Sequence, residues 1–237
     1  MVNNKLFAGA GIIVRKPGGE AAGGSITVVE TQHAKKVSSL IFALKAVFEN
    51  DLDYFNKYEF YGRLADAANV QLQHEDDLAA IRKAVLAEAC MMATEMGKHL
   101  YFAYGSNMDI DQMAGRCPSA VFVETATLQG YEFELDCTGV ATVVESCGST
   151  VYGVLWLISE SDEQELDWYE GVSSGCYRKA VLPVIDAEGE SLPALVYVSN
   201  RDVHDGITYR SGYLNNIINN AKRLGFDTEY IAKLESK

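Results

Sequence analysis

The order of hydrophobic and polar positions predicts helices in the first part of this chain and short strands in the second. Apolar side chains between residues 34 and 50 recur every three or four positions, which is typical of an amphipathic helix. The same spacing over residues 75–96 predicts another helix, ended by Gly97. Two β-branched runs, 5–14 and 25–30, flank a loop rich in proline and glycine and predict a hairpin. Residues 1–97 are therefore expected to form the smaller α+β domain, a hairpin plus helices.

Short strand-like runs separated by turn residues dominate residues 98–237. Their regular spacing predicts a mixed or antiparallel sheet that curls into a barrel. The fold class expected for this part is therefore α+β, with a mixed β-barrel and flanking helices. The expected strands are 100–104, 120–128, 132–137, 140–144, 151–158, 179–185 and 193–199, with turns at 129–130 and 148–149, and the expected helices are 109–116, 159–171, 211–224 and 228–235.

The negative charge of the chain belongs almost entirely to its second part. The net charge of the 237 residues is −13. Residues 1–100 hold 11 basic and 12 acidic side chains, whereas residues 101–237 hold 9 and 21. Such an acidic domain repels phosphate backbones, which argues against nucleic acid and anionic membranes as partners. The asymmetry also supports a domain boundary near residue 98.

The cysteines and the apolar runs favour a cytoplasmic protein. The five cysteines are odd in number and include no Cys-x-x-Cys pair, so we expect reduced thiols. No stretch approaches 18 uninterrupted apolar residues, and the first residues lack the pattern of a signal peptide.

No cofactor or metal is expected. Gly9 and Gly11 suggest a dinucleotide-binding loop, but Val14 stands where the third glycine belongs and a strand-like run replaces the helix. The histidines of the first part are far apart and lack the spacing of metal ligands.

The helix expected over residues 159–171 carries its own start and stop signals. Ser159 and Asp162 approximate a capping box, and Gly171 is a favourable residue for the end of the helix. Leu166 and Tyr169 are expected to supply its buried side.

Glu170 lies in the last turn of that helix, where the helix dipole is negative. A carboxylate there should have a raised pKa, which is the direction that a general base near neutral pH needs. From position alone, a solvated surface carboxylate is the better interpretation.

A second candidate is the loop that follows the strand at 100–104. Gly-Ser-Asn favours turns and can aim backbone N–H groups at an anion without a metal or a basic side chain. Taken alone, it reads as an ordinary loop.

Several motifs in register change both interpretations, because together they resemble the gamma-glutamylcyclotransferase-like family. The resemblance covers residues 100–237 and implies a small mixed barrel with a cavity. The motifs are Tyr-Gly-Ser-Asn-Met at 104–108, Val-Tyr-Gly-Val-Leu at 151–155, Leu-Asp-Trp-Tyr-Glu-Gly-Val at 166–172, Tyr177, Val-Tyr-Val at 196–198 and Tyr213 at the start of a late helix.

The resemblance implies an amide-cleaving cyclotransferase of the lyase class that needs no cofactor. In that reaction the α-amine of a γ-glutamyl group attacks its own γ-carbonyl, forms 5-oxoproline and expels the attached amine. Glu170 would be the single acid/base, and Tyr177 and Tyr213 would orient Glu170 or the substrate. The loop would bind the α-carboxylate and amine of the small γ-glutamyl substrate through Tyr104, Gly105, Ser106, Asn107 and Met108.

The chain departs from the family pattern near its end. Tyr209 and Arg210 stand where the family often has Pro-Ser, and Asn220 and Ala221 stand where it often has Gly-Ala. These departures concern the wall of the pocket, and therefore the tail of the substrate, more than the chemistry. Since branches acting on glutathione or γ-glutamylamines usually have Leu soon after the Ser or Thr of the loop, Asn-Met here favours γ-glutamyl amino acids or related amides.

Two other functions remain open at this point. The barrel could be reused by a non-catalytic binding or regulatory protein, although the retained Glu170 and loop argue against it. A cysteine hydrolase using Cys176 and His204 has no supporting signature, and an inert cysteine is the better interpretation. Residues 1–97 could be a lid, a docking domain or a self-association module; homo-oligomerisation is favoured because an aromatic run at 54–61 would prefer to be buried.

Overall fold

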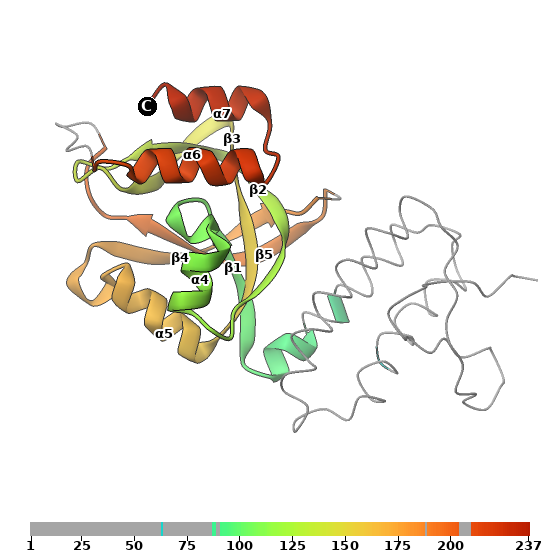
Figure 1. Ribbon diagram of the computed structural model, residues 1–237. Coiled ribbons are helices and arrows are strands. Elements are labelled where there is room, and N and C mark those ends of the chain that lie inside the picture. The colour runs from blue at the N-terminus through green and yellow to red at the C-terminus, as the bar shows by residue number, and fades with distance from the viewer. Residues whose placement is uncertain (1–62, 64–86, 89–90, 188, 204–209) are drawn as a thin grey trace, which may run out of the picture. The chain divides into compact units, whose positions relative to one another are not determined.

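The computed structural model describes residues 63, 87–88, 91–187, 189–203 and 210–237 (Figure 1). The chain divides into two compact units, Met1–Gly97 and Lys98–Lys237. In the first unit, residues 91–95 are helical, and Gly97 follows in the left-handed region with φ 66°, in agreement with the predicted helix end. The hairpin at 5–30, the helix at 34–50 and the aromatic run at 54–61 lie outside the described residues.

The second unit is a closed barrel of five strands, so the predicted mixed barrel is confirmed. The strands follow the order β1-β3-β2-β4-β5 around the barrel. β5 pairs with β1 in parallel, through Tyr101 and Leu195, and the remaining pairs are antiparallel. The strands are β1 (Lys98–Ala103), β2 (Val121–Leu135), β3 (Ala141–Ser159), β4 (Tyr177–Ile185) and β5 (Ser191–Ser199).

Two of the predicted strand breaks are wrong. The runs 120–128 and 132–137 form the single strand β2, and the runs 140–144 and 151–158 form the single strand β3. Their ladder shifts register between Gln129 and Tyr131, where Gly130 has φ 78°. The glycines at 130 and 148 therefore permit irregularities inside a continuing ladder and do not end the strands.

The core of the barrel requires a glycine at position 153. A Cβ atom there would lie 2.4 Å from the carbonyl oxygen of Ala103 and 2.6 Å from the ring of Phe102. Phe102 is fully buried, and Ala103 belongs to the neighbouring strand β1. The glycine of the Val-Tyr-Gly-Val-Leu motif is thus explained by the close approach of β3 to β1.

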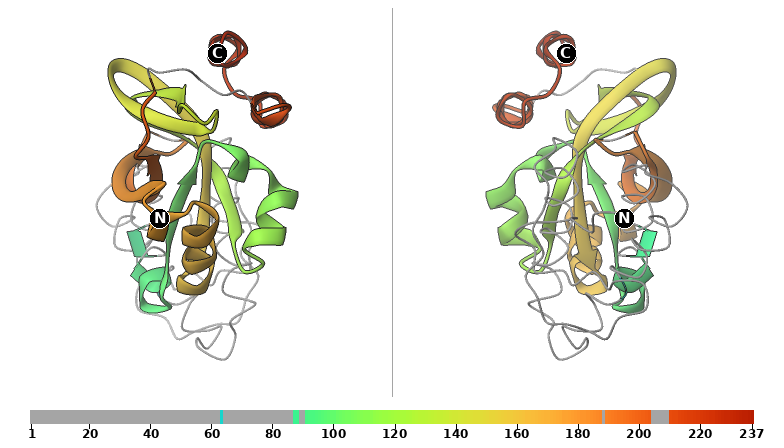
Figure 2. Two further views of the ribbon diagram at one scale, coloured as in Figure 1. Left: turned by 90° about the vertical axis from the view of Figure 1, so that its left-hand side faces the viewer. Right: turned by 90° about the vertical axis from the view of Figure 1, so that its right-hand side faces the viewer.

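Four helices pack around the barrel, and all four were predicted. Figure 2 shows α6 and α7 together at one end of the barrel, where the rings of Phe226 and Tyr230 contact Tyr152 of β3 with centroid distances of 5.5 and 4.8 Å. No helix within the described ranges is long and apolar enough to cross a bilayer. The helices are α4 (Ile110–Arg116), α5 (Glu160–Tyr169), α6 (Tyr213–Arg223) and α7 (Thr228–Glu235).

The ends of α5 confirm part of what the sequence predicted. Ser159 Oγ accepts from the Asp162 N–H at 3.2 Å, and Asp162 Oδ2 accepts from the Ser159 N–H at 2.9 Å, which completes the capping box. Leu166 is buried, but Tyr169 is 45% exposed, so its assignment to the buried side is wrong. The last turn of the helix extends beyond the core, and the Arg116 guanidinium lies over the Tyr169 ring at 4.5 Å.

We expect Gly153→Ala to destabilise the barrel by about 1–3 kcal/mol, because its Cβ would overlap backbone that cannot move without distorting β1. Thermal unfolding followed by circular dichroism measures the effect. The matched control is Gly115→Ala in α4, where an added Cβ meets nothing within 4 Å and helix propensity favours alanine. Equal melting temperatures for the Gly153→Ala variant and the wild type would contradict the packing argument.

Candidate active site

The loop after β1 turns directly into a helix. Ser106–Met108 form a short 3-10 turn, and Asp109 then caps α4 by accepting from the Gln112 N–H at 2.8 Å. None of the hydrogen bonds among the described residues uses the backbone N–H of Gly105, Ser106 or Asn107. These donors are available to a bound anion or carbonyl oxygen.

The side chain of Asn107 is buried and uses every hydrogen-bonding position of its amide. Its Oδ1 accepts from Arg116 Nη1 at 2.6 Å and from Gln112 Nε2 at 3.2 Å. Its Nδ2 donates to the Tyr101 hydroxyl at 2.9 Å and to Glu170 Oε1 at 3.2 Å. Because Arg116 and Gln112 both donate to Oδ1, the amide can adopt only one orientation, and its nitrogen must face Glu170.

Glu170 is the C-cap residue of α5 and is partly buried. The chain turns away at Gly171, whose φ of 64° suits glycine. Burial raises the pKa of Glu170 above its ordinary value, while the charge of Arg116 and the hydrogen bond from Asn107 act in the opposite direction. The direction expected from the sequence is found, but burial is its main cause, whereas the sequence argument relied on the helix dipole.

The hydroxyl groups of the three tyrosines that were predicted for the site bond to backbone. Tyr177 donates to the Ala141 carbonyl at 2.6 Å, and the Ala141 N–H donates to the Tyr213 hydroxyl at 3.2 Å. Tyr104 donates to the Tyr197 carbonyl. Burial raises the pKa of Tyr104, Tyr177 and Tyr213, so these hydroxyls stay protonated. Ala141 is thus the anchor of two predicted site tyrosines.

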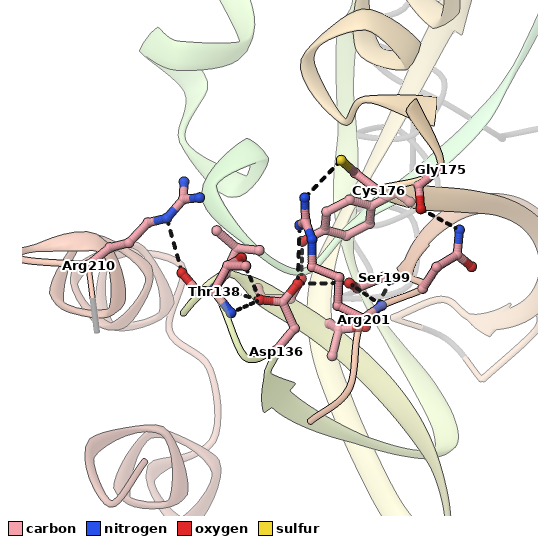
Figure 3. Close-up of polar contacts among 12 residues, drawn as sticks. Asp136, Thr138, Gly175, Cys176, Ser199, Arg201 and Arg210 are labelled. Carbon is pink, nitrogen blue, oxygen red and sulfur yellow. Dashed lines mark hydrogen bonds and ion pairs between the residues drawn. The ribbon is translucent and has the colours of Figure 1, made fainter. Parts of the chain in front are cut away.

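A buried carboxylate holds the turn that precedes Ala141. Asp136 is fully buried and accepts from the Thr138 N–H at 2.8 Å and from Ser199 Oγ at 2.7 Å (Figure 3). Burial alone would raise the pKa of Asp136, but the hydrogen bonds from Thr138 and Ser199 outweigh it and lower the pKa. This turn fastens the start of β3 to the end of β5.

One cavity of about 320 Å³ collects most of the predicted site residues. Met108 is the exception, since it is 1% exposed and belongs to the core. Tyr101, Ala141 and Tyr197 also line the cavity and were not predicted as site residues. Tyr197 belongs to the Val-Tyr-Val motif, to which no role in the site was assigned. The predicted residues in its wall are Tyr104, Gly105, Ser106, Asn107, Glu170, Tyr177 and Tyr213.

A second cavity of about 610 Å³ continues from the first. The two share Ser106, Glu170, Tyr177 and Tyr213, so Glu170 lies at their junction. We call them the inner and the outer cavity. Arg116 lines the outer cavity and was missed by the sequence analysis, although its place in the last turn of the helix after the loop was visible.

The described residues also bear on metal binding and on the surroundings of Cys176. Within the part of the chain that the structure describes, no group of three or more His, Cys, Asp or Glu side chains could hold a metal ion. Cys176 Sγ lies 2.8 Å from Arg201 Nη2, and His204, its suggested partner, lies outside the described residues.

Comparisons with known proteins agree on one family. The sequence model of the AIG2-like family matches residues 150–234. Gamma-glutamylcyclotransferase of Bos taurus is 34% identical over 147 residues, 58% of this chain and 77% of that protein. The Homo sapiens protein of the same name is 32% identical over 147 residues, with the same coverage. A solved structure named gamma-glutamyl cyclotransferase is 31% identical, with a TM-score of 0.54 over 59% of this chain and 87% of that one.

We expect Glu170→Gln to become more stable than the wild type as the pH rises. Because the folded-state pKa of Glu170 is raised, its contribution to stability is fully present below the unfolded pKa of about 4.3 and is lost as the pH rises through the folded value. Thermal unfolding from pH 4 to pH 8 measures the difference. The control is Glu165→Gln on the exposed side of α5; a pH-independent difference for the Glu170→Gln variant would refute the raised pKa.

Proposed function

This chain belongs to the gamma-glutamylcyclotransferase family, and on that premise we propose that it converts a γ-glutamyl substrate into 5-oxoproline and a free amine, with Glu170 as the single general acid/base. The observation that carries the proposal is the setting of Glu170. Its carboxylate has a raised pKa, is held by a uniquely oriented Asn107 amide, and lies at the junction of two cavities.

The reaction needs only one residue that moves a proton. The α-amino group, with a pKa near 8, is largely protonated at neutral pH and must lose a proton before its nitrogen can attack. Glu170 takes that proton, the nitrogen bonds to the γ-carbonyl carbon, and a tetrahedral intermediate forms. The bond from that carbon to the leaving nitrogen then breaks as Glu170 returns the proton to the leaving nitrogen. The ring nitrogen gives up its second proton through the same carboxylate to the released amine, which leaves as an ammonium. No water is consumed, and atoms and charge balance.

The loop after β1 is suited to the charged parts of the substrate. The unengaged N–H groups of Gly105, Ser106 and Asn107 would bind the α-carboxylate or the γ-carbonyl oxygen as negative charge develops on it. These donors are backbone groups held between β1 and α4, so they need little reorganisation during the reaction.

The tyrosines of the inner cavity would act through position. Tyr177 and Tyr213 are fixed to Ala141 by their hydroxyls, and Tyr104 is fixed to β5. A rigid wall that holds the flexible glutamyl chain in a folded conformation brings the amine close to the carbonyl, and such positioning supplies much of the rate in a ring closure. The resemblance implied that Tyr177 and Tyr213 orient either Glu170 or the substrate, and this proposal takes the second of these roles.

The substrate would lie across both cavities. The glutamyl group would occupy the inner cavity, and the leaving amine would extend into the outer one, because Glu170 must reach both nitrogen atoms. We therefore favour γ-glutamyl amino acids or related γ-glutamyl amides as substrates. A purely binding role for the barrel would give no reason for a poised Glu170 at the junction.

Replacing Glu170 by Gln should reduce 5-oxoproline release by about 10²–10⁴-fold, because the amide cannot accept the proton of the α-amine. Release is measured by chromatography on a panel of γ-glutamyl amino acids, γ-glutamylamines and glutathione. Glu165→Gln is the matched control and should keep full activity. Unchanged release by the Glu170→Gln variant would rule out this carboxylate as the acid/base.

Replacing Arg116 by Gln should move the acidic limb of the pH profile of kcat/KM to higher pH. The positive charge of Arg116 lowers the pKa of Glu170, so its loss raises that pKa, and protonation inactivates the base sooner as the pH falls. Arg116→Lys keeps the charge and serves as the control. A limb that stays in place in the Arg116→Gln variant would contradict the electrostatic coupling.

A further inference from the structure

The wall of the outer cavity is rich in arginine, although the domain as a whole is strongly acidic. Its wall contains three arginines, Arg116, Arg201 and Arg210, and one carboxylate, Glu170. Residues 101–237 hold only 9 basic side chains against 21 acidic ones. A third of the basic residues of this region therefore gather around one cavity, and this concentration indicates an anionic ligand.

Arg210 has fewer interactions with the described residues than the other two arginines. Its Nε donates to the Thr138 carbonyl at 3.2 Å, which holds the side chain against the turn between β2 and β3. Its two terminal nitrogens make no hydrogen bond or ion pair with the described residues. Figure 3 shows Arg210 on one side of this turn and Arg201 on the other.

Arg201 is fixed in place by a buried partner. Its Nη1 lies 3.4 Å from Asp136 Oδ2, and its Nη2 donates to Cys176 Sγ at 2.8 Å. About a third of the Arg201 side chain is exposed. A guanidinium held at one edge and open at another is preorganised for a planar carboxylate.

Arg116 serves a different purpose, because it is turned toward the inner site. It donates to Asn107 Oδ1 at 2.6 Å, and its guanidinium is stacked on Tyr169. Arg201 and Arg210 are thus the two groups in the wall of the outer cavity that remain for the part of the substrate beyond the scissile amide.

We propose that Arg201 and Arg210 form a subsite for the carboxylates of the leaving group, so that the preferred substrates are γ-glutamyl conjugates of an acidic amino acid. The inference rests on the proposed function, since it takes Glu170 to mark the bond that breaks. An acidic amino acid carries an α-carboxylate and a side-chain carboxylate, one for each guanidinium. The outer cavity is the larger of the two, at about 610 Å³ against about 320 Å³ of space that is partly open to solvent.

The sequence supports the same assignment from another direction. Arg210 stands where the related family often has the serine of a Pro-Ser pair, a departure in the wall of the pocket. In this structure that departure places a positive charge in the wall of the outer cavity. It therefore alters what the leaving group must look like and leaves the proton transfer unchanged.

The test compares substrates that differ only in the charge of the leaving side chain. γ-Glutamyl-glutamate and γ-glutamyl-glutamine have nearly the same shape, so any preference between them reports charge. We expect kcat/KM for the glutamate conjugate to exceed that for the glutamine conjugate by about 5- to 10-fold at low salt, and the preference to shrink as ionic strength rises. Equal kcat/KM values for the two conjugates would overturn the proposal.

Arg210→Gln should remove most of that preference, chiefly by raising KM for the glutamate conjugate. Arg201→Lys, which keeps a charge beside Asp136, should weaken the preference without unfolding the protein. Arg178→Gln removes an exposed arginine of β4 outside both cavities and is the matched control. A preference that survives intact in the Arg210→Gln variant would contradict the assignment of this residue.

Binding to the Glu170→Gln variant separates this inference from the proposed reaction. Calorimetric titration of that variant with the two conjugates measures the subsite without turnover. Tighter binding of the glutamate conjugate, lost on adding Arg210→Gln, supports the subsite even if the wild type releases no 5-oxoproline. Equal affinities, or no binding of either conjugate, would overturn it.

Discussion

The arrangement of this site depends on the buried amide of Asn107. Four hydrogen bonds join it to Tyr101 of β1, to Gln112 and Arg116 of α4, and to Glu170 after α5. A buried amide that lost one of these partners would leave a polar atom unsatisfied in the core. These bonds therefore fix the positions of the strand, the loop and both helix ends relative to one another. The Glu170 carboxylate that they surround has little freedom to move. Its raised pKa follows from the same arrangement, since burial dominates over the nearby donors.

A second constraint acts from the opposite side of the cavity. Ala141, at the start of β3, offers its carbonyl to Tyr177 and its N–H to Tyr213, two residues far apart in sequence. The turn before it is fixed by the buried Asp136, which ties β2, β3 and β5 together. Gly153 allows β3 to approach β1 closely enough for the barrel to close in this form. The backbone in the wall of the cavity is thus held in place by side chains that are distant in the sequence.

Under the proposed function, the charged groups of the two cavities would face different parts of one substrate. The inner cavity has neutral tyrosine hydroxyls and a single carboxylate, whereas the outer cavity has three arginines. Glu170 belongs to both, which is the position required of a group that takes a proton from one nitrogen and gives it to another. The domain is acidic, but arginines are concentrated at the outer cavity. An anion would therefore be attracted to this cavity, although the net charge of the domain is negative.

Patterns along the chain predict the barrel and its helices, whereas Glu170 became the acid/base candidate through the resemblance to a known family, because its position alone favours a solvated carboxylate. Strand periodicity, the capping box at Ser159, the glycine after Glu170 and the order of the motifs are local features, and local features can be read from a chain. Other features are visible only in the folded structure. β2 and β3 are continuous, Tyr169 is exposed, and Met108 is buried in the core. Tyr101, Tyr197 and Arg116 line the two cavities. Only the folded structure shows that Arg201 and Arg210 line the same cavity. These facts depend on which distant side chains meet when the barrel closes, and no spacing along a single chain records that.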